Sequence, residues 1–366
     1  MKIAFCGDIM LNSPELHSIG KKLSKKLKDC DIRCINFEAP VRTSEALGIH
    51  KSGPVLDQSA KTPAWLRSNG FNLITLANNH ALDHGQKGIE STISYFEEMN
   101  ITGVGRYNDA YNFTVIEKGN QKIGFLGLTH KEFGCVDIDS GEQLGTAMLT
   151  SPKVFKSIIE TKPYIDKLFI LPHAGVEYLD IPLPEWRELY KTFIDIGANG
   201  VIASHPHVPQ GYEFYKGSPI FYSLGNFLFE REKPLTERWF KSIVVILDTT
   251  TNDTEVLLVK YDYANKTVEI DSSEEAQTYF IHLNNLLKEE NYRQKIEEES
   301  VRLRSTYHNM MKNGGAYSFG LKEKLKNLIR PLIGRKKIKT DQVHLLNLFQ
   351  CESHRWMMMR LLKSLK

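Results

Sequence analysis

Cysteine is scarce in this chain of 366 residues, and long apolar segments are missing. The five cysteines are odd in number and form no Cys-x-x-Cys pair, which argues against a disulfide framework and against a zinc site built on thiolates. No window of 18 residues is uninterruptedly apolar, and the first eight residues show no apolar core or cleavage site of a signal peptide. These absences predict reduced thiols, no transmembrane helix and a cytoplasmic location, with peripheral contact at the inner face of the membrane left open.

The net charge is also small, because opposite charges in two parts of the chain cancel. It is +3, from 47 Lys+Arg against 44 Asp+Glu. Residues 321–366 hold 12 basic and 3 acidic residues, so this segment carries +9 and residues 1–320 carry −6. Apolar residues from Leu321 to Ile333 recur on one helical face, which predicts a basic amphipathic helix. Such a helix could dock on the core, form a homodimer contact or bind a membrane surface. No motif indicates a nucleic-acid partner.

Internal repeats and low-complexity segments are missing too, and short apolar runs alternate with amphipathic stretches up to about residue 230. This alternation predicts an α/β protein with a buried central sheet. Strands are expected at 2–6, 34–37, 73–77, 123–128, 167–172, 200–203, 220–223, 241–248, 255–264 and 266–271, the last three antiparallel. A strand with a glycine turn is expected at 222–229. Helices are expected at 15–27, 62–69, 87–99, 152–162 and 184–196. From residue 273 the chain is helical and charged, so we predict a domain at 1–272 and a helical, basic C-terminal extension at 273–366.

Polar side chains follow five of the expected strands. In an open α/β sheet, ligand crevices form at the carboxyl ends of the strands, so we expect these side chains to share one site. Two of these residues, His205 and His207, flank Pro206, and we expect the proline to hold both in extended backbone. The candidate metal ligands are Asp8, Glu38, Asn79, His173, His205 and His207.

This set contains two carboxylates, one amide and three imidazoles. Such a mixture suits one or two divalent ions of Mn, Zn, Fe or Ni, and is too rich in nitrogen for Ca or Mg alone. A metal pair polarises a phosphoryl oxygen and lowers the pKa of a bound water. His80 directly follows the candidate ligand Asn79, so it is the candidate to protonate a leaving group or to stabilise a developing oxyanion.

Five further residues are weaker candidates, each with a structural alternative. Asp83 and Glu177 could orient His80 and His173, or could cap helices or lie on the surface. Asn226 could face the site or could be a buried structural asparagine. His130 and Lys51 could contact an acidic substrate.

Six motifs follow one another across about residues 1–230. They are Gly7-Asp8-Ile9-Met10-Leu11, Asn36-Phe37-Glu38, Ala77-Asn78-Asn79-His80 with Asp83 and Gly85, His173-Ala174-Gly175-Val176-Glu177-Tyr178, His205-Pro206-His207-Val208 with Gln210, and Tyr222-Ser223-Leu224-Gly225-Asn226-Phe227. In this order they resemble the CapA family of capsule or poly-γ-glutamate biosynthesis proteins, within the calcineurin-like metallophosphoesterase superfamily. The resemblance implies a four-layer α/β/β/α metallophosphoesterase sandwich.

The resemblance also implies roles for single residues. Asp8 would bind a first metal and Glu38 would bridge two. Asn79, His173 and His205 would complete the second metal site, His207 would return to the first, and His80 would be the catalytic imidazole. Met10 stands where the superfamily commonly has a histidine, two residues after the first aspartate. This departure weakens the first metal site and leaves open a mononuclear centre.

These observations favour a metal-dependent hydrolase, foremost a phosphoesterase, in capsule or surface-polymer biosynthesis. Its substrate would be an anionic small molecule or polymer. Two alternatives stay open. One is amide-bond hydrolysis or transfer on poly-γ-glutamate, and the other is a non-catalytic accessory role in capsule assembly or export.

Overall fold

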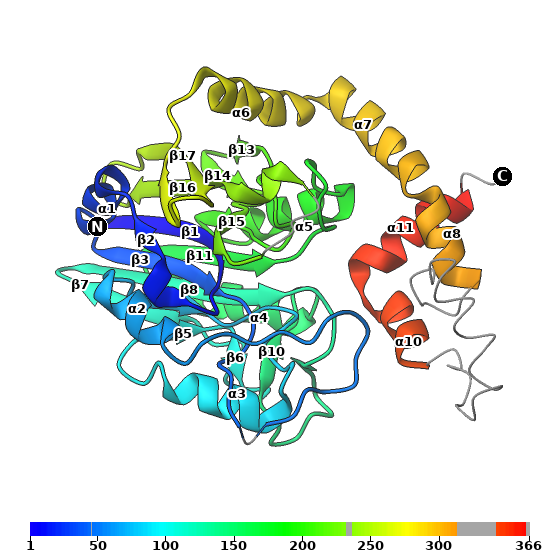
Figure 1. Cartoon of the computed structure of the whole chain (residues 1–366), viewed down its shortest axis with the longest axis horizontal. Coiled ribbons are helices and arrows are strands. Elements are labelled where there is room, and N and C mark those ends of the chain that lie inside the picture. Colours follow the sequence, from blue (N-terminus) through cyan, green and yellow to red (C-terminus); the bar gives the residue numbers. More distant parts are fainter. Residues whose placement is uncertain (45, 232–235, 313–341, 364–366) are drawn as a thin grey trace.

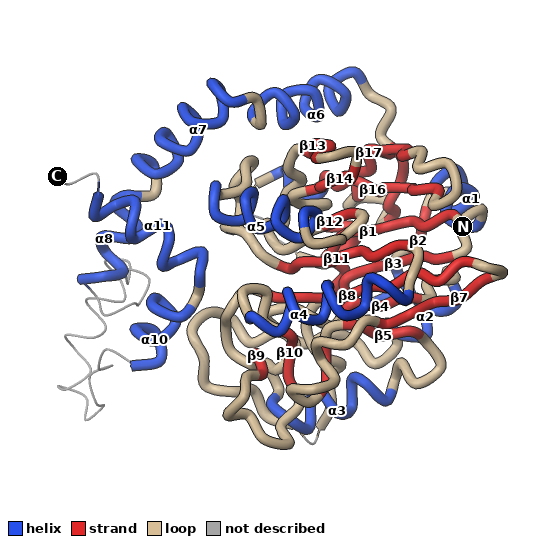
Figure 2. The backbone as a smooth tube through the Cα atoms, turned by 180° about the vertical axis from the view of Figure 1, so that it is seen from behind, coloured by secondary structure: helices blue, strands red, loops and turns tan. Residues whose placement is uncertain are grey.

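The computed structural model describes residues 1–44, 46–231, 236–312 and 342–363, and two β-sheets lie at the centre of this part of the chain (Figure 2). The larger sheet has the order β2-β18-β17-β16-β1-β3-β4-β5, with β15 also pairing β1, and the smaller has the order β13-β14-β12-β11-β8-β7. Strands of the larger sheet are β1 (Lys2–Met10), β2 (Ser18–Ile19), β3 (Ile32–Phe37), β4 (Leu73–Thr75), β5 (Asn100–Thr102), β15 (Asn226–Phe229), β16 (Lys241–Asp248), β17 (Thr254–Asp262) and β18 (Thr267–Ile270). Strands of the smaller are β7 (Thr114–Lys118), β8 (Gln121–Thr129), β11 (Lys167–His173), β12 (Gly200–Ile202), β13 (Tyr212–Tyr215) and β14 (Ser218–Phe221).

The two sheets face each other across an apolar core. In β1, Ile3 and Phe5 point into this core, whereas Ala4 and Cys6 pack against the outer helices, because successive strand residues face opposite sides. The helices α1 (Lys21–Lys28) and α2 (Thr62–Ser68) cover the larger sheet, and α4 (Pro152–Thr161) and α5 (Pro184–Asp195) cover the smaller one (Figure 1). The predicted α/β/β/α layering is therefore confirmed. The predicted antiparallel strands β16, β17 and β18 are confirmed as well.

The predicted helix at 15–27 is wrong in its first half. A single 3-10 turn (Pro14–Leu16) and the strand β2 precede α1, which begins at Lys21. The backbone N–H groups of Ser18 and Gly20 donate to the carbonyls of Lys266 and Val268, at 3.0 and 2.8 Å. These N–H groups thus form hydrogen bonds with the edge of the sheet, whereas in a helix they would bond within the helix.

Two other predicted boundaries also differ. The helix predicted at 87–99 is α3 (Gly85–Ser94), and i→i+3 turns carry the chain from its end to β5. The strand predicted at 222–229 is divided: β14 ends at Phe221 in the smaller sheet, and β15 begins at Asn226 in the larger sheet. Between them the backbone passes so close to β1 that a Cβ atom on Gly7 would lie 1.8 Å from the Gly225 carbonyl oxygen. Only glycine therefore fits at position 7.

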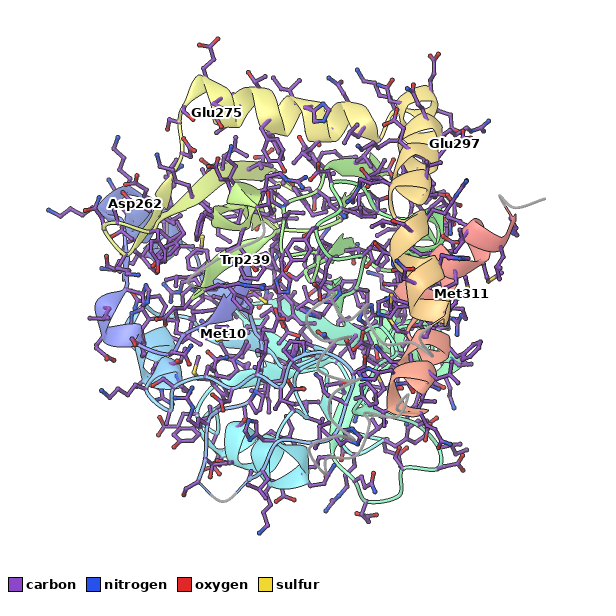
Figure 3. The ribbon with its side chains drawn as sticks, turned by 45° about the vertical axis from the view of Figure 1, so that its right-hand side comes forward. Met10, Trp239, Asp262, Glu275, Glu297 and Met311 are labelled. Carbon is purple, nitrogen blue, oxygen red and sulfur yellow. The ribbon has the colours of Figure 1, made fainter. Side chains whose placement is uncertain are left out.

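A small third sheet and the C-terminal helices complete the described structure. The small sheet joins β6 (Val104–Gly105), β9 (Cys135–Val136) and β10 (Gly145–Ala147). The C-terminal helices are α6 (Glu274–Leu286), α7 (Glu289–Arg302), α8 (Arg304–Lys312), α10 (Gln342–Gln350) and α11 (Glu352–Lys363). Figure 3, where Glu275, Glu297 and Met311 mark α6, α7 and α8, shows these three helices along the top and one side of the sandwich.

The C-terminal helices share the core of the sandwich. The Trp356 ring of α11 lies edge-on to the Trp186 ring of α5, with centroids 4.2 Å apart. Arg360 donates two hydrogen bonds to the Glu185 carboxylate, at 2.8 and 2.7 Å. This side of the sandwich is therefore covered by the end of the chain. The domain boundary at 272/273 stays a prediction.

Two predictions about the C-terminal part need separate statements. The basic amphipathic helix predicted from Leu321 to Ile333 lies outside the described residues. Within the described ranges, the helices lack the length and apolar content that a membrane crossing requires.

Removing a large side chain from the core between the sheets should destabilise the protein strongly. Phe169 is 1% exposed and packs between Phe5 and Phe125, with ring centroids at 5.5 and 5.9 Å. We expect Phe169→Ala to lower the free energy of unfolding by about 3–5 kcal/mol, because it leaves a cavity that the two sheets cannot close. The matched control is Phe214→Ala, whose side chain is 54% exposed, with an expected loss of about 0.5 kcal/mol or less. Guanidinium unfolding curves measure both, and equal losses would contradict the assignment of the core.

Candidate metal centre

The polar residues of the candidate site converge because parallel strands of both sheets end at the same edge. β1 pairs in parallel with β3 and with β15, and its register places Asp8 beside Asn36 and Asn226. The predicted first strand is too short, since β1 continues through Asp8 to Met10 with a register shift on each side of it. In the smaller sheet, β11 ends at His173 and β12 precedes the His205–His207 segment. Each sheet thus contributes part of the site.

Three of the six predicted ligands form one compact group. Suitable ligand atoms of Asp8, Glu38 and His207 all lie within 4.8 Å of one another. His207 Nε2 is 3.6 Å from a Glu38 carboxylate oxygen, and His207 Nδ1 is 4.0 Å from Asp8 Oδ2. One cation could therefore contact all three side chains.

The other three predicted ligands form an adjoining group. His173 Nε2 is 3.0 Å from Asn79 Oδ1 and 3.1 Å from His205 Nδ1. Asn36, which was missed as a site residue, joins the two groups: its Nδ2 donates to Asp8 Oδ1 at 2.7 Å and lies 3.1 Å from His173 Nδ1. The sequence did carry a signal for Asn36: it lies in β3, two residues before Glu38, and residues two apart in extended chain point to the same side.

Burial of two carboxylates, one of them without a hydrogen-bond partner among the described residues, is the main electrostatic feature of the site. Asp8 and Glu38 are both 0% exposed, and neither oxygen of Glu38 has a hydrogen-bond partner among the described residues. Burial, and then the neighbouring Asp8, raise the pKa of Glu38 well above its usual range, and burial raises the pKa of Asp8 as well. An ionised carboxylate left in this state is costly, whereas a divalent cation would relieve the cost.

The imidazoles are also suited to a cation. Burial lowers the pKa of His173 and of His205 well below the usual value, so both rings are neutral and offer a lone pair. The site thus presents oxygen and neutral nitrogen donors, the mixture that borderline divalent metals prefer. The side chains present therefore fit the divalent metal ion or ions that the sequence predicts.

The two histidines that flank Pro206 are not extended, so that prediction is wrong. His205 has φ +102° and His207 has φ +59°, both in the left-handed region that residues other than glycine seldom adopt. The His205 N–H donates to Asp8 Oδ2 at 3.3 Å and helps hold this conformation. Such backbone strain is typical of functional sites, where the surrounding structure imposes it.

His80 lies beside the group of Asp8, Glu38 and His207, and a buried ion pair fixes its ring. His80 Nδ1 is 2.7 Å from Asp83 Oδ2, and His80 Nε2 is 4.0 Å from Glu38 Oε1. Lys51 pairs with Asp83 and donates to the Asn79 carbonyl at 3.2 Å. Burial acts to raise the pKa of Asp83, but hydrogen bonds from His80 and Lys51 bring it below the usual value. Asp83 is therefore ionised and accepts a hydrogen bond from the His80 Nδ1–H group.

The other weaker candidates take different places. Asn226 Oδ1 lies 3.0 Å from His207 Nδ1, so Asn226 orients this ring. Glu177 is exposed, and the contact with His173 Nδ1 comes from Asn36 instead. His130 is 1% exposed, and its ring centroid lies 4.4 Å from that of His205.

A cavity of about 640 Å³ opens above these groups. Its floor includes His80, His205 and His207, and one wall is formed by Met10, Tyr178 and Trp239. Met10 packs against Trp239 in this apolar wall, and Figure 3 labels both. The opposite side comes from the C-terminal helices, including Leu303, Met310 and Cys351. The cavity is large enough for a small-molecule substrate or the end of a polymer.

Comparison with known proteins was made for sequence and for structure. The family profile described as "Bacterial capsule synthesis protein PGA_cap" matches residues 2–231. Capsule biosynthesis protein CapA of Bacillus anthracis is 31% identical over 248 residues, which cover 63% of this chain and 60% of that protein. PGA biosynthesis protein CapA of Bacillus subtilis (strain 168) is 28% identical over 247 residues, which cover 63% of this chain and 64% of that protein. The match thus spans less than two thirds of either relative.

The solved structures show weaker likeness. A putative 5'-nucleotidase from Staphylococcus aureus has a TM-score of 0.45 and 15% identity, and covers 78% of this chain and 59% of that chain. The NAD nucleotidase of Haemophilus influenzae has a TM-score of 0.41 and 12% identity, and covers 86% of this chain and 72% of that chain. The family profile, by contrast, covers more than half of the chain, so the chain belongs to the bacterial capsule synthesis protein PGA_cap family.

Proposed function

We propose that this protein is a metal-dependent hydrolase, foremost a phosphoesterase, that acts in capsule or surface-polymer biosynthesis. The observation that carries the proposal is the buried Glu38 carboxylate, which has no hydrogen-bond partner among the described residues and lies beside Asp8, His207 and His80. Buried polar atoms nearly always have hydrogen-bond partners, so a buried carboxylate without any indicates a site where a cation or substrate binds. Membership of the family supports the biosynthetic context.

The residues that would hold divalent metal are the six predicted ligands, in the two adjoining groups described above. When bound, the metal supplies a Lewis acid for a phosphoryl oxygen and lowers the pKa of bound water. Asn36 and Asn226 keep the carboxylate and imidazole donors oriented through their hydrogen bonds. The aromatic wall and the C-terminal helices line the cavity above these donors.

His80 would move a proton at the leaving oxygen of the substrate. Asp83 accepts a hydrogen bond from His80 Nδ1–H. The other ring nitrogen, Nε2, then faces Glu38 and the cavity, where it could exchange a proton with the substrate. Arg231 lines the same cavity, and its guanidinium lies over the Trp239 ring at 5.0 Å, where it can attract an anionic substrate.

Loss of the His80 imidazole should remove activity without removing metal. We expect His80→Ala to lower the rate of phosphoester hydrolysis by about 10²–10⁴-fold, the range typical of a positioned acid or base. His84→Ala is the matched control, because His84 is half-buried, pairs with Asp57 at 3.2 Å and does not line the described cavity. Initial rates on a panel of phosphate monoesters and diesters measure the effect. Unchanged rates in a metal-loaded His80→Ala variant would refute the role of His80.

Neutralising the buried Glu38 should have opposite effects with and without metal. With metal, we expect Glu38→Gln to lower both the bound metal and the melting temperature, because a ligand is lost. After chelation, we expect Glu38→Gln to melt at a higher temperature than the wild type at neutral pH. The wild type must either bury an unpartnered charge or take up a proton at Glu38, and glutamine avoids both costs. Elemental analysis and thermal unfolding measure these quantities, and Glu97→Gln on the surface is the control. A chelator-treated wild type that melts as the untreated protein does, with no metal in either, would contradict the proposal.

The bond that is cleaved can be tested with the polymer named by the relatives. The alternative reaction is amide hydrolysis or transfer on poly-γ-glutamate, which the same Lewis acid could support by polarising a carbonyl. We expect the wild type to hydrolyse phosphoesters and to leave the chain length of poly-γ-glutamate unchanged. Shortened polymer would establish amide chemistry instead. Inactivity on both substrates, with full capsule formation in cells carrying Asp8→Asn, would establish an accessory role.

A further inference from the structure

A second group of metal-ligand side chains lies beside the candidate metal centre. Suitable ligand atoms of His130, Glu132 and Cys351 all lie within 4.8 Å of one another, and His130 Nε2 is 3.6 Å from Glu132 Oε1. His130 and Glu132 come from the loop after β8, and Cys351 joins α10 to α11. Cys351 is far from the other two residues in the sequence, so only the folded chain brings it to them.

The imidazole of this group points into it without a partner. His130 is 1% exposed, and its Nε2 has no hydrogen-bond partner among the described residues. The other ring nitrogen, Nδ1, lies 3.3 Å from Ser353 Oγ, and this contact orients the ring so that Nε2 faces the group. Cys351 is 1% exposed as well. A buried nitrogen lone pair directed at a carboxyl and a thiol is an arrangement that a cation would satisfy.

The thiol is held in place by the anchoring of its neighbours. The Glu352 carboxylate accepts hydrogen bonds from the Lys131 backbone N–H at 2.5 Å and from Thr150 Oγ1 at 2.7 Å. Ser353 donates to the Gly175 carbonyl. These bonds attach the start of α11 to the loop that carries His130 and Glu132. The three ligands are therefore preorganised across the contact between the sandwich and the C-terminal extension.

We propose that His130, Glu132 and Cys351 form a second metal site, selective for Zn²⁺, whose remaining coordination position faces the cavity. One imidazole, one carboxylate and one thiolate are zinc donors, and the thiolate selects against Mn²⁺ and Mg²⁺. Three protein ligands with one open position are the pattern of a zinc ion that contacts solvent or substrate. All three residues line the cavity shared with the candidate metal centre.

The charges of the ligands explain how this zinc could lie so close to another metal. The His130 and His205 rings are in edge contact, with centroids 4.4 Å apart. One carboxylate and one thiolate neutralise the two charges of Zn²⁺, so the second site adds no net charge beside the first. The zinc would also fasten α10 and α11 to the loop after β8. The proposal does not depend on the reaction at the first centre.

Cobalt substitution tests the site, because a thiolate bound to Co²⁺ gives a charge-transfer band in the near ultraviolet. The six candidate ligands of the first centre include no sulfur, so this band would not come from that centre. The chain has four other cysteines, so the assignment to Cys351 rests on the variants. We expect the band in the wild type, in Cys30→Ser and in Glu38→Gln, and its loss in Cys351→Ser. Cys30 is the matched control, since its buried thiol donates to the Lys26 carbonyl at 3.4 Å in the outer helical layer. Absence of the band from the wild type, or its persistence in Cys351→Ser, would overturn the proposal.

Two further measurements separate loss of the site from loss of the fold. We expect Cys351→Ser to retain the circular dichroism of the wild type and to bind Zn²⁺ at least about 100-fold more weakly at this site. X-ray absorption of the wild type with one equivalent of Zn²⁺ needs no variant, and should show one sulfur at about 2.3 Å. A shell of only nitrogen and oxygen would refute the proposal. Metal at the first centre with no sulfur signal would leave the proposed hydrolase standing and would refute the second site alone.

Discussion

Two carboxylates buried side by side at the edge of both sheets are the constraint on which the site depends. Asp8 and Glu38 are fully buried; burial raises the pKa of both, and Asp8 raises the pKa of Glu38 further. The fold gives Asp8 hydrogen bonds from Asn36 and from the His205 backbone, but gives Glu38 none among the described residues. This imbalance makes Glu38 the group that most needs a cation. The His173 and His205 imidazoles are neutral because burial lowers the pKa of both rings, and a low-dielectric environment disfavours their charged forms.

The geometry of the site follows from how the chain changes sheets. After β14 in the smaller sheet, the chain turns at Gly225 and enters the larger sheet as β15, parallel to β1. This crossing places Asn226 beside Asp8 and lets it orient His207. Gly7 permits the close approach of the two backbones. A short stretch without regular structure thus determines how donors from both sheets meet.

The C-terminal helices complete the cavity that the sandwich begins. α7, α8, α10 and α11 share the apolar core of the smaller sheet's outer face, and they supply part of the cavity lining. Substrate would therefore meet residues from both ends of the chain. The family match covers the segment that holds the six candidate ligands and ends at residue 231, before the C-terminal helices.

The sequence by itself predicted the α/β alternation and the six candidate ligands, because strand alternation and polar residues after strands are local patterns. The four-layer order was implied only by the resemblance to a known family. The sequence placed Asp8 and Glu38 in one site through the rule that parallel strands end at one edge. Only the tertiary structure decided how those residues are arranged: the strained backbone at His205, the role of Asn36 and the split at residues 222–225. The meeting of Cys351 with His130 is also tertiary, and the cysteine count had argued against any thiolate site. Spacing rules detect ligands that are neighbours in sequence, whereas packing of the last helices brings distant ligands together.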